Sequence, residues 1–342
     1  MSEAPPFWFQ KPGLAAWLLS PFSGLYGQIA TRRMQAGHSY VSSLPVFCVG
    51  NFIAGGAGKT PTAIALAKIA RKMDLKPGFL SRGYGGGVNK PTLVDIRSHN
   101  AQDVGDEPLI LAQYAPTVVS ADRPAGARML EEQNVDLIFM DDGFQNASLH
   151  KDYSLLVVDA GRGLGNGYCI PAGPMRAPLR PQLALASGLL LIGQSQAGTE
   201  VVRKAAKMAK PVLLAEIAVR KPQTWQGKKV LAYCGIASPQ KFHKSLEECG
   251  AEIVETRNFH DHHPYTHDEC KELLDLAVEK GLTLVTTEKD HMRLSRMGES
   301  QKALQSVSLV LQIDLKFENP KMVEVALRDT IKRAADFRLA KG

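Results

Sequence analysis

A glycine-rich turn between an apolar run and a helical pattern constrains the fold of this chain more than any other segment. The turn spans residues 50–60, follows the apolar run Pro45–Val49 and ends in Gly58-Lys59-Thr60. Glycines allow successive backbone N–H groups to converge on phosphate oxygens, and the next helix adds the positive end of its dipole. A lysine can then reach the terminal phosphates, and a threonine hydroxyl can bind Mg²⁺. The segment therefore predicts a strand, a phosphate-binding loop and a helix.

The turn departs at one position from the strict P-loop pattern G-x-x-x-x-G-K-[ST]. Ile53 stands where the first glycine belongs. A cluster of glycines without more would be typical of an ordinary turn, but the Lys-Thr pair and the strand–turn–helix context favour nucleotide binding. The expected nucleotide-binding residues of this turn are Gly55, Gly56, Ala57, Gly58, Lys59 and Thr60.

Two adjacent aspartates, Asp141 and Asp142, follow the apolar run 135–140. P-loop proteins hold Mg²⁺ with a carboxylate at the tip of such a strand. A single aspartate in this position is often only a turn or helix-cap residue. Two neighbouring carboxylates, however, repel each other unless a cation lies between them. The pair therefore predicts a Mg²⁺ site that includes the hydroxyl of Thr60.

Short apolar runs alternate with helical patterns from residue 45 to about residue 200. This alternation predicts an α/β fold of the P-loop NTPase type, in which helices cover both faces of a parallel sheet. A second, smaller α/β region is expected from residue 211, because the chain is long enough for two cores. We therefore expect an N-terminal helical segment (1–40), a P-loop core (41–210) and a second α/β domain (211–342) whose C-terminal helix can pack back on the core. Residues 212–219, 230–233 and 282–287 are the strands expected in the second domain.

The N-terminal segment is rich in aromatic and apolar residues. It contains Phe7-Trp8-Phe9, the run 14–19 and the pair Arg32-Arg33. The continuous apolar run is far below the ~20 residues needed to span a bilayer. Tryptophans, a short apolar helix and trailing arginines are typical of a helix in the membrane interface. A helix packed on its own domain would show the same pattern, so the residues leave both alternatives open.

The composition is that of an ordinary globular protein. Hydrophobic residues make up 44% of the chain and charged residues 22%, which excludes a disordered segment. None of the five cysteines falls in a C-x-x-C pair, so we expect reduced thiols in a cytosolic chain. The net charge of +7 suits an anionic ligand or an anionic membrane face.

Two further segments carry titratable side chains. In the first, Gly105–Pro108, the acids either stabilise the start of a helix or supply Asp106 as a general base for an acceptor hydroxyl. The second, Phe259–Pro264, is the most histidine-rich part of the chain. It contains no cysteine and no H-E-x-x-H spacing, which argues against zinc and favours a histidine beside a catalytic aspartate, or a surface cluster. A metal-dependent hydrolase is the rival interpretation, built on His260, Asp261, His262 and His263.

Taken together, these motifs resemble those of the tetraacyldisaccharide 4'-kinase family, the lipid A 4'-kinases of Gram-negative bacteria. The resemblance implies transfer of the ATP γ-phosphate to the 4'-hydroxyl of tetraacyldisaccharide 1-phosphate, which gives lipid IVA. It also implies a peripheral location on the cytoplasmic face of the inner membrane, held by the N-terminal helix. We expect a monomer with no nucleic-acid partner. The matching segments, in chain order, are Val49–Pro61, Ser81–Gly85, Gly105–Pro108, Asp141–Gln145, Asp159–Pro174, Phe259–His263 and Thr286–Asp290.

The resemblance also implies roles for individual residues. One group would hold ATP and Mg²⁺: Lys59 and Thr60 for the phosphates and the metal, Asp141 and Asp142 for the metal, and Arg176 for the nucleotide. A second group would act on the acceptor, with Asp106 as the base and His262 orienting it and tuning its charge. Positioning and charge neutralisation carry most of phosphoryl transfer, so this set is sufficient.

One position departs from the family pattern. The family loop usually reads P-A-G-P-L-R-E-P, whereas this chain has Ala177 in place of the glutamate and keeps Arg176 before it. We expect the enzyme to be active regardless, with any role of the missing acid absent or supplied by Glu107. The alternative class of function is a P-loop switch or assembly ATPase, which would hydrolyse ATP without a lipid acceptor.

Overall fold

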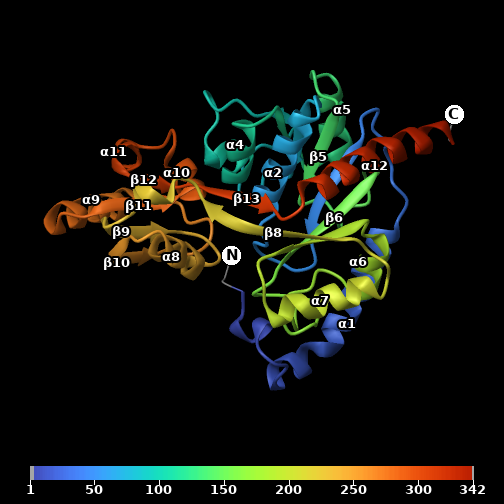
Figure 1. Ribbon diagram of the computed structural model, residues 1–342, viewed down its shortest axis with the longest axis horizontal. Helices are drawn as coiled ribbons and strands as arrows, with labels where there is room; N and C mark the ends of the chain where they lie inside the picture. The colour runs from blue at the N-terminus through green and yellow to red at the C-terminus, as the bar shows by residue number, and fades with distance from the viewer. Residues whose placement is uncertain (1–3, 341–342) are drawn as a thin grey trace.

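A computed structural model describes residues 4–340 and contains two sheets flanked by helices (Figure 1). The strands of the large sheet are β1 (Val46–Asn51), β2 (Pro77–Ser81), β3 (Thr92–Leu93), β4 (Thr117–Val119), β5 (Leu137–Asp141), β6 (Tyr153–Asp159), β7 (Gly188–Ile192), β8 (Val212–Val219) and β13 (Ile313–Phe317). Their order is β13-β8-β7-β6-β1-β5-β2-β4-β3. All neighbours are parallel except the edge pairs β13–β8 and β3–β4.

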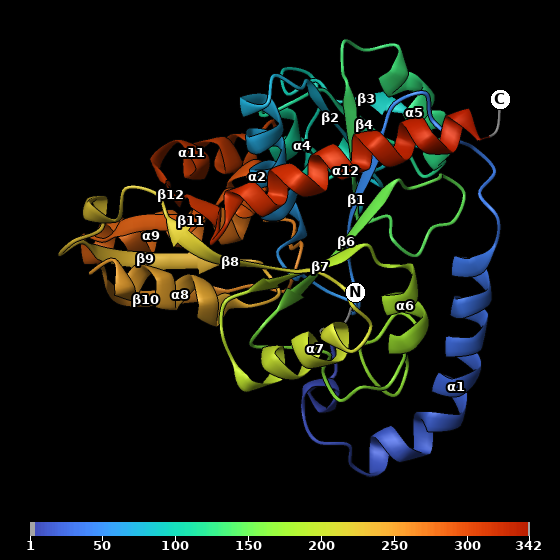
Figure 2. The same ribbon diagram turned by 45° about the vertical axis from the view of Figure 1, so that its right-hand side comes forward.

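Helices cover both faces of the large sheet, as Figure 2 shows. One face packs against α2 (Lys59–Lys72), α4 (Asp106–Ala112) and α12 (Pro320–Leu339). The other packs against α1 (Leu14–Gln35), α5 (Arg123–Glu131), α6 (Leu179–Leu185) and α7 (Gln196–Ala206), and the short α3 (Ala101–Val104) precedes α4. Every residue of β1, β5 and β6 is buried, which explains why these strands are almost continuously apolar in sequence.

The second domain has its own sheet and two small cores. Its strands are β9 (Lys229–Cys234), β10 (Glu252–Asn258), β11 (Thr283–Thr287) and β12 (Leu309–Leu311), in the order β10-β9-β11-β12 and all parallel. Helix α8 (Pro239–Glu248) packs on one face, and α9 (His267–Lys280), α10 (Glu288–Leu294) and α11 (Glu299–Val307) pack on the other. The predicted fold class, a parallel sheet with helices on both faces plus a smaller α/β domain, is confirmed.

The structure assigns one predicted strand to a different sheet. We expected residues 212–219 to begin the second domain, but β8 pairs with β7 and β13 in the large sheet. The chain leaves this sheet after β8 and returns to it at β13, where Arg220 and Asp314 form an ion pair with an Nε–Oδ2 distance of 2.6 Å. The C-terminal helix α12 then packs on α2. We therefore place the second domain between β8 and β13. The expected N-terminal segment and second domain also include residues 1–3 and 341–342, which lie outside the described residues.

Helix α1 turns its small residues inward and its large apolar residues outward. Ser23 donates a hydrogen bond to the carbonyl of Cys169 at 2.8 Å, and a Cβ atom on Gly27 would lie 3.1 Å from Cγ of Pro178. This close approach to the domain requires small side chains on the inner side of the helix. Its exposed face carries Leu14, Trp17, Leu18, Phe22 and Leu25. No helix in residues 4–340 has the length and apolar content to cross a membrane.

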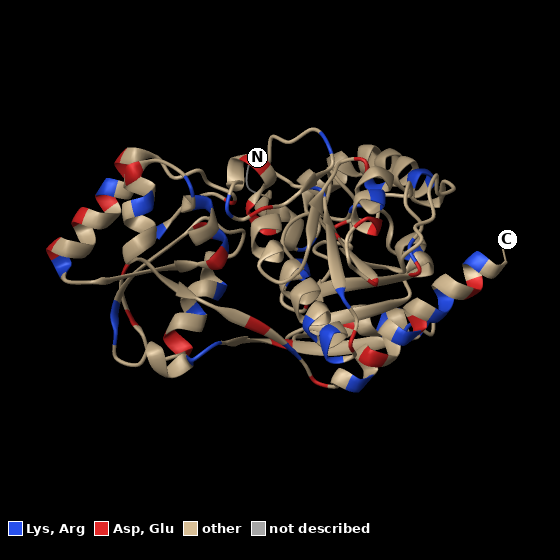
Figure 3. Cartoon of the chain, turned by 90° about the horizontal axis from the view of Figure 1, so that it is seen from above, with Lys and Arg blue, Asp and Glu red and all other residues tan. Residues whose placement is uncertain are grey.

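The two long helices at the ends of the described chain differ in the distribution of charged residues on their surfaces. Helix α12 carries Lys, Arg, Asp and Glu along its whole length (Figure 3). Helix α1 contains no charged residue before Arg32. An exposed face without charged residues is therefore found on α1 and not on α12.

Candidate active site

The predicted phosphate-binding loop connects β1 to α2, and its glycines are required by its geometry. Gly55 and Gly58 have φ of +98° and +86°, in the left-handed region that other residues rarely adopt. A Cβ atom on Gly58 would also lie 2.6 Å from Cδ1 of Ile192 on β7. Helix α2 begins at Lys59, so its free N–H groups and its dipole are directed at the loop.

The predicted donor residues converge beside this loop. Asp141 ends β5, which pairs with β1 so that Asp141 lies opposite Val49. Its Oδ2 lies 3.5 Å from the hydroxyl of Thr60. Asp142 lies 3.6 Å from Nζ of Lys59 and forms a bidentate ion pair with Arg176, at 2.6 and 3.0 Å. The sequence thus placed these residues in one site, but it did not predict that Arg176 and Asp142 contact each other.

The two aspartates have different electrostatic surroundings. Burial and the nearby charge of Glu107 raise the pKa of Asp141 to about 7. Desolvation acts in the same direction on Asp142, but Lys59 and Arg176 outweigh it and hold the pKa of Asp142 well below its ordinary value. The Oδ1 atom of Asp141 is buried without a hydrogen-bond partner among the residues that the structure describes. A buried oxygen in this state fits a ligand of a hard cation such as Mg²⁺.

Asp106 lies at the start of α4 and receives its partners from the second domain. Its Oδ2 accepts hydrogen bonds from Nε of Arg293 at 2.7 Å and from Nδ1 of His262 at 3.2 Å, with the imidazole N–H as donor. The side chain of Asp106 is 3% exposed. Burial raises its pKa, but the hydrogen bond from His262 and the charges of Lys289 and Arg293 dominate and hold that pKa well below its ordinary value.

His262 is held in an unusual backbone conformation beside this carboxylate. Its φ is +61°, and Asp142 in the donor group has φ of +51°. Such conformations cost free energy in residues other than glycine and concentrate at functional sites. The hydrogen bond to Asp106 raises the pKa of His262. The ring of Tyr84, from the glycine-rich loop after β2, lies 5.2 Å from the ring of His262, centroid to centroid.

Glu107 links the donor residues to Asp106. Its carboxylate forms an ion pair with Lys289 of α10, and its charge contributes to the raised pKa of the Asp141 carboxyl. Because Glu107 follows Asp106 in α4, the predicted base and the predicted metal ligands belong to one electrostatic cluster. Asp106 belongs to the large domain, whereas His262 and Lys289 belong to the second domain, so the cluster contains residues of both domains.

Sequence reasoning missed three charged residues of this cluster. Arg293 and Lys289 lie on α10, in or just after the segment Thr286–Asp290, which matched the family without an assigned role. Arg123 is 2% exposed and donates to the carbonyl of Asp142 at 3.3 Å. Its position directly before a proline at a helix start carries no signal for such a contact.

Two other histidines of the segment Phe259–Pro264, His260 and His263, contact each other and an acid. His263 hydrogen-bonds to His260 at 2.8 Å and to Glu269 at 2.9 Å. Within residues 4–340, no three His, Cys, Asp or Glu side chains are grouped so as to hold a metal ion. The hydrolase interpretation, which needed such a group around residues 260–263, is therefore not supported.

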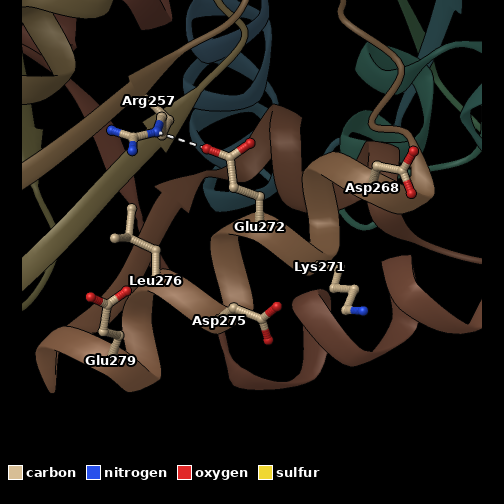
Figure 4. A pocket seen from close by; sticks show the side chains of 7 residues that line it. All are labelled: Arg257, Asp268, Lys271, Glu272, Asp275, Leu276 and Glu279. Atoms are coloured by element: carbon tan, nitrogen blue, oxygen red, sulfur yellow. Dashed lines mark hydrogen bonds and ion pairs between the residues drawn. The ribbon is translucent and has the colours of Figure 1, made fainter.

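Two other features lie outside the cluster. Ala177, at the position of the family glutamate, is fully buried, and its carbonyl accepts a hydrogen bond from Gln182 at 2.6 Å. A shallow hollow of about 420 Å³ lies on the second domain along α9, and Figure 4 shows its lining. None of the predicted site residues lines it. Its lining residues are Arg257, Asp268, Lys271, Glu272, Asp275, Leu276 and Glu279.

A phosphate-binding loop in one cluster with the buried carboxylate of Asp106 favours a P-loop kinase over a switch ATPase, which needs no base for an acceptor. The comparison with known proteins agrees with this class. A family model described as Tetraacyldisaccharide-1-P 4'-kinase matches residues 15–332, and the chain belongs to that family.

Relatives and a solved structure match over almost the whole chain. The tetraacyldisaccharide 4'-kinase of Agrobacterium fabrum is 51% identical over 94% of this chain and 92% of its own length. That of Rhizobium rhizogenes is 48% identical over 100% and 96%, respectively. A crystal structure of LpxK from Aquifex aeolicus in complex with ATP has the same fold, with a TM-score of 0.73 and 24% identity, and covers 93% of this chain and 100% of that chain.

Proposed function

We propose that this chain transfers the γ-phosphate of ATP to the 4'-hydroxyl of tetraacyldisaccharide 1-phosphate, which forms lipid IVA. Membership of the kinase family supports the reaction and the acceptor. The observation that carries the proposal is the single cluster that contains both a phosphate-binding loop and the Asp106–His262 pair. Both substrates are anionic, in keeping with the net charge of +7. We propose that the enzyme acts as a monomer without a nucleic-acid partner.

The donor half would bind ATP through the loop and α2. Backbone N–H groups of residues 55–60 would surround the phosphates, and Lys59 would contact the terminal ones. Arg176 holds Asp142 through two hydrogen bonds, and its Nε donates to the carbonyl of Ile53 at 3.1 Å. The same guanidinium would contact the nucleotide when the phosphates occupy the site.

Thr60, Asp141 and Asp142 would hold Mg²⁺. The unpartnered Oδ1 of Asp141 and the hydroxyl of Thr60, 3.5 Å from Oδ2 of the same aspartate, supply oxygen ligands of the kind that Mg²⁺ prefers. When bound, the ion would neutralise charge that develops on the transferred phosphoryl group. Lys59 neutralises the charge of Asp142 without the metal, because its ammonium lies 3.6 Å from that carboxylate.

Asp106 would act on the acceptor. Its carboxylate would take the proton of the 4'-hydroxyl while the hydroxyl oxygen bonds to the γ-phosphorus and the bond to the β-phosphate oxygen breaks, with ADP as the leaving group. His262 would keep the carboxylate oriented through its N–H and would stabilise its charge. Asp106 and His262, the two side chains that act on the acceptor proton in this step, contact each other in the cluster.

Helix α1 would bind the enzyme to the cytoplasmic face of the inner membrane as a peripheral protein. Its exposed face carries large apolar side chains, with Trp17 62% and Phe22 64% exposed, and Arg32 and Arg33 lie in its last turn. Aromatic and aliphatic side chains on one face with trailing cations fit the interface between acyl chains and anionic headgroups. Such a location would also bring the site to a lipid acceptor that cannot leave the membrane.

The acceptor dependence of turnover tests the reaction. ADP formation would be measured with ATP and Mg²⁺, with and without tetraacyldisaccharide 1-phosphate in detergent micelles. We expect little turnover until the acceptor is added, and a product that carries one more phosphate. Equal ATP hydrolysis with and without the acceptor would instead support a switch or assembly ATPase.

Flotation with vesicles tests the role of α1. Replacing Trp17, Phe22 and Leu25 with serine should release the protein from vesicles of phosphatidylethanolamine and phosphatidylglycerol. A matched control replaces Met322 and Val325, exposed apolar residues of α12, and should float like the unaltered protein. Undiminished flotation of the α1 variant would refute membrane binding through this face.

A further inference from the structure

We infer that Arg293 of the second domain is a positioning residue for Asp106, fixing the orientation of its carboxylate and supplying the positive charge that it needs in a buried site. The inference rests on the proposed function, because it gives Arg293 a purpose in turnover only if Asp106 takes the acceptor proton. It goes beyond the Asp106–His262 pair that the sequence indicated.

Arg293 is held rigidly by its own domain. Its side chain is 6% exposed, and its Nη1 donates to the carbonyl of Gly235 at 2.7 Å and to Asp290 at 2.5 Å. Asp290 in turn accepts hydrogen bonds from the Tyr265 hydroxyl and from the N–H of Gly235, both at 2.9 Å. The guanidinium is therefore fixed at the end of β9 and on α10 before it reaches the other domain.

From this fixed position Arg293 contacts Asp106 across the domain boundary. Both Nε and Nη2 lie 2.7 Å from Oδ2 of Asp106. The same oxygen receives the hydrogen bond from His262 at 3.2 Å. The two donors on Oδ2 leave little freedom for rotation of the carboxylate.

The other carboxylate oxygen is the one left for the acceptor. Oδ1 of Asp106 accepts a hydrogen bond from the backbone N–H of Glu107 at 2.8 Å. A carboxylate oxygen can accept two hydrogen bonds, so Oδ1 keeps a lone pair for the acceptor hydroxyl. By saturating Oδ2, Arg293 and His262 direct proton transfer to Oδ1.

The charges around Asp106 indicate what the loss of Arg293 would do. The carboxylate faces His262 from the loop after β10, Lys289 and Arg293 from α10, and Glu107 from its own helix. The positive groups keep its pKa low against the effect of burial. Without Arg293, burial would be opposed less, so the pKa of Asp106 would rise, and the carboxylate would lose the contact that fixes its orientation.

The test compares Arg293→Met and Arg293→Lys in the full-length enzyme, with pH profiles of kcat and with KM for ATP. We expect Arg293→Met to lower kcat by roughly 10- to 100-fold at pH 7, because the carboxylate loses its fixed orientation, and to move the acid limb of the profile upward. KM for ATP should change little, because the donor residues lie in the other domain. Arg293→Lys keeps the charge and should restore most of the unaltered acid limb.

Two controls separate this role from folding and from the proposed function. Arg220→Met removes a half-buried ion pair with Asp314, and it should lower Tm without moving the acid limb. If Arg293→Met fails to fold, the smaller shift expected for Arg293→Lys remains measurable. An acid limb that is unchanged in both Arg293 variants would overturn the inference. Full activity of Asp106→Asn would instead overturn the proposed base, a result that the Arg293 variants alone cannot give.

Discussion

The proposed donor half and the proposed base half of the candidate active site are built in different ways. The donor half lies within the large domain, where β1, the glycine-rich loop and α2 are consecutive and Asp141 is placed by the pairing of β5 with β1. The base half joins Asp106 of the large domain to His262 and Arg293 of the second, 156 and 187 positions further along the chain. Binding of ATP should therefore depend on one domain, whereas transfer should depend on contact between two.

This difference separates two kinds of defect. A change in the donor half should weaken ATP binding and turnover together. A change in the base half should lower kcat while ATP still binds, because none of its residues belongs to the loop. If mutations in the two halves had the same effects on ATP binding and on kcat, the two halves would not act separately.

The largest effect is expected in the donor half, from Lys59→Ala. Loss of the ammonium removes the contact with the terminal phosphates and the neutralisation of Asp142, so kcat/KM should fall by about 10³-fold or more. Calorimetry should show weaker ATP binding as well. Lys72→Ala, at the exposed end of the same helix, is the control and should behave like the unaltered enzyme. Unchanged ATP affinity of Lys59→Ala would contradict the role of the loop.

The next effect is expected in the base half, from Asp106→Asn. The amide has nearly the same shape but cannot take a proton, so kcat should fall by about 10²- to 10⁴-fold. The dissociation constant for ATP should stay close to that of the unaltered enzyme. A kcat near normal would show that another group accepts the proton, and weaker ATP binding would show that the two halves are not separable.

The same difference decides what the sequence could predict. The proximity of Lys59, Thr60 and Asp141 could be predicted, because these residues are consecutive or end neighbouring strands. Arg176 was associated with them only through the family resemblance. Strands β9 and β11 lie within one residue of the ranges 230–233 and 282–287 that the sequence predicts. Strand β8 was found at its predicted residues but in the wrong sheet, since periodicity identifies an element and not its partner.

The contacts of the base half were less predictable. His262 could be associated with Asp106 only through the family resemblance. Arg293 was missed, because nothing in its local sequence indicates a contact with a residue 187 positions earlier. Strand β10 was also missed: it lies at the edge of its sheet, alternates between exposed and partly buried residues, and contains several charges.

A smaller effect, dependent on pH, is expected from His262→Gln. The hydrogen bond to Asp106 raises the pKa of His262 above 6.5, so protonated His262 stabilises the folded protein below pH 6.5. That stabilisation is lost as the pH rises through the raised pKa. Chemical denaturation at a series of pH values should show this decline in the unaltered protein and not in His262→Gln. Parallel pH profiles of the two proteins would contradict the pairing.

Turnover should also distinguish the glutamine variant from Asp106→Asn. Glutamine can still donate a hydrogen bond but carries no positive charge, so kcat should fall by roughly tenfold, less than on loss of the base itself. A larger loss than that of Asp106→Asn would make His262, and not Asp106, the more important group of the base half.

The smallest effect on turnover is expected at Ala177, next to the donor residue Arg176. The unaltered enzyme should be active, because Lys59, Arg176 and Asp142 already form the donor contacts without an acid at residue 177. In Ala177→Glu a carboxylate would replace a fully buried methyl group, so Tm should fall while kcat changes by less than about threefold. An inactive unaltered enzyme that gains activity with Ala177→Glu would show that the donor half is incomplete without this acid. The contacts of the donor half would then depend on residue 177 as well as on the loop, α2 and β5.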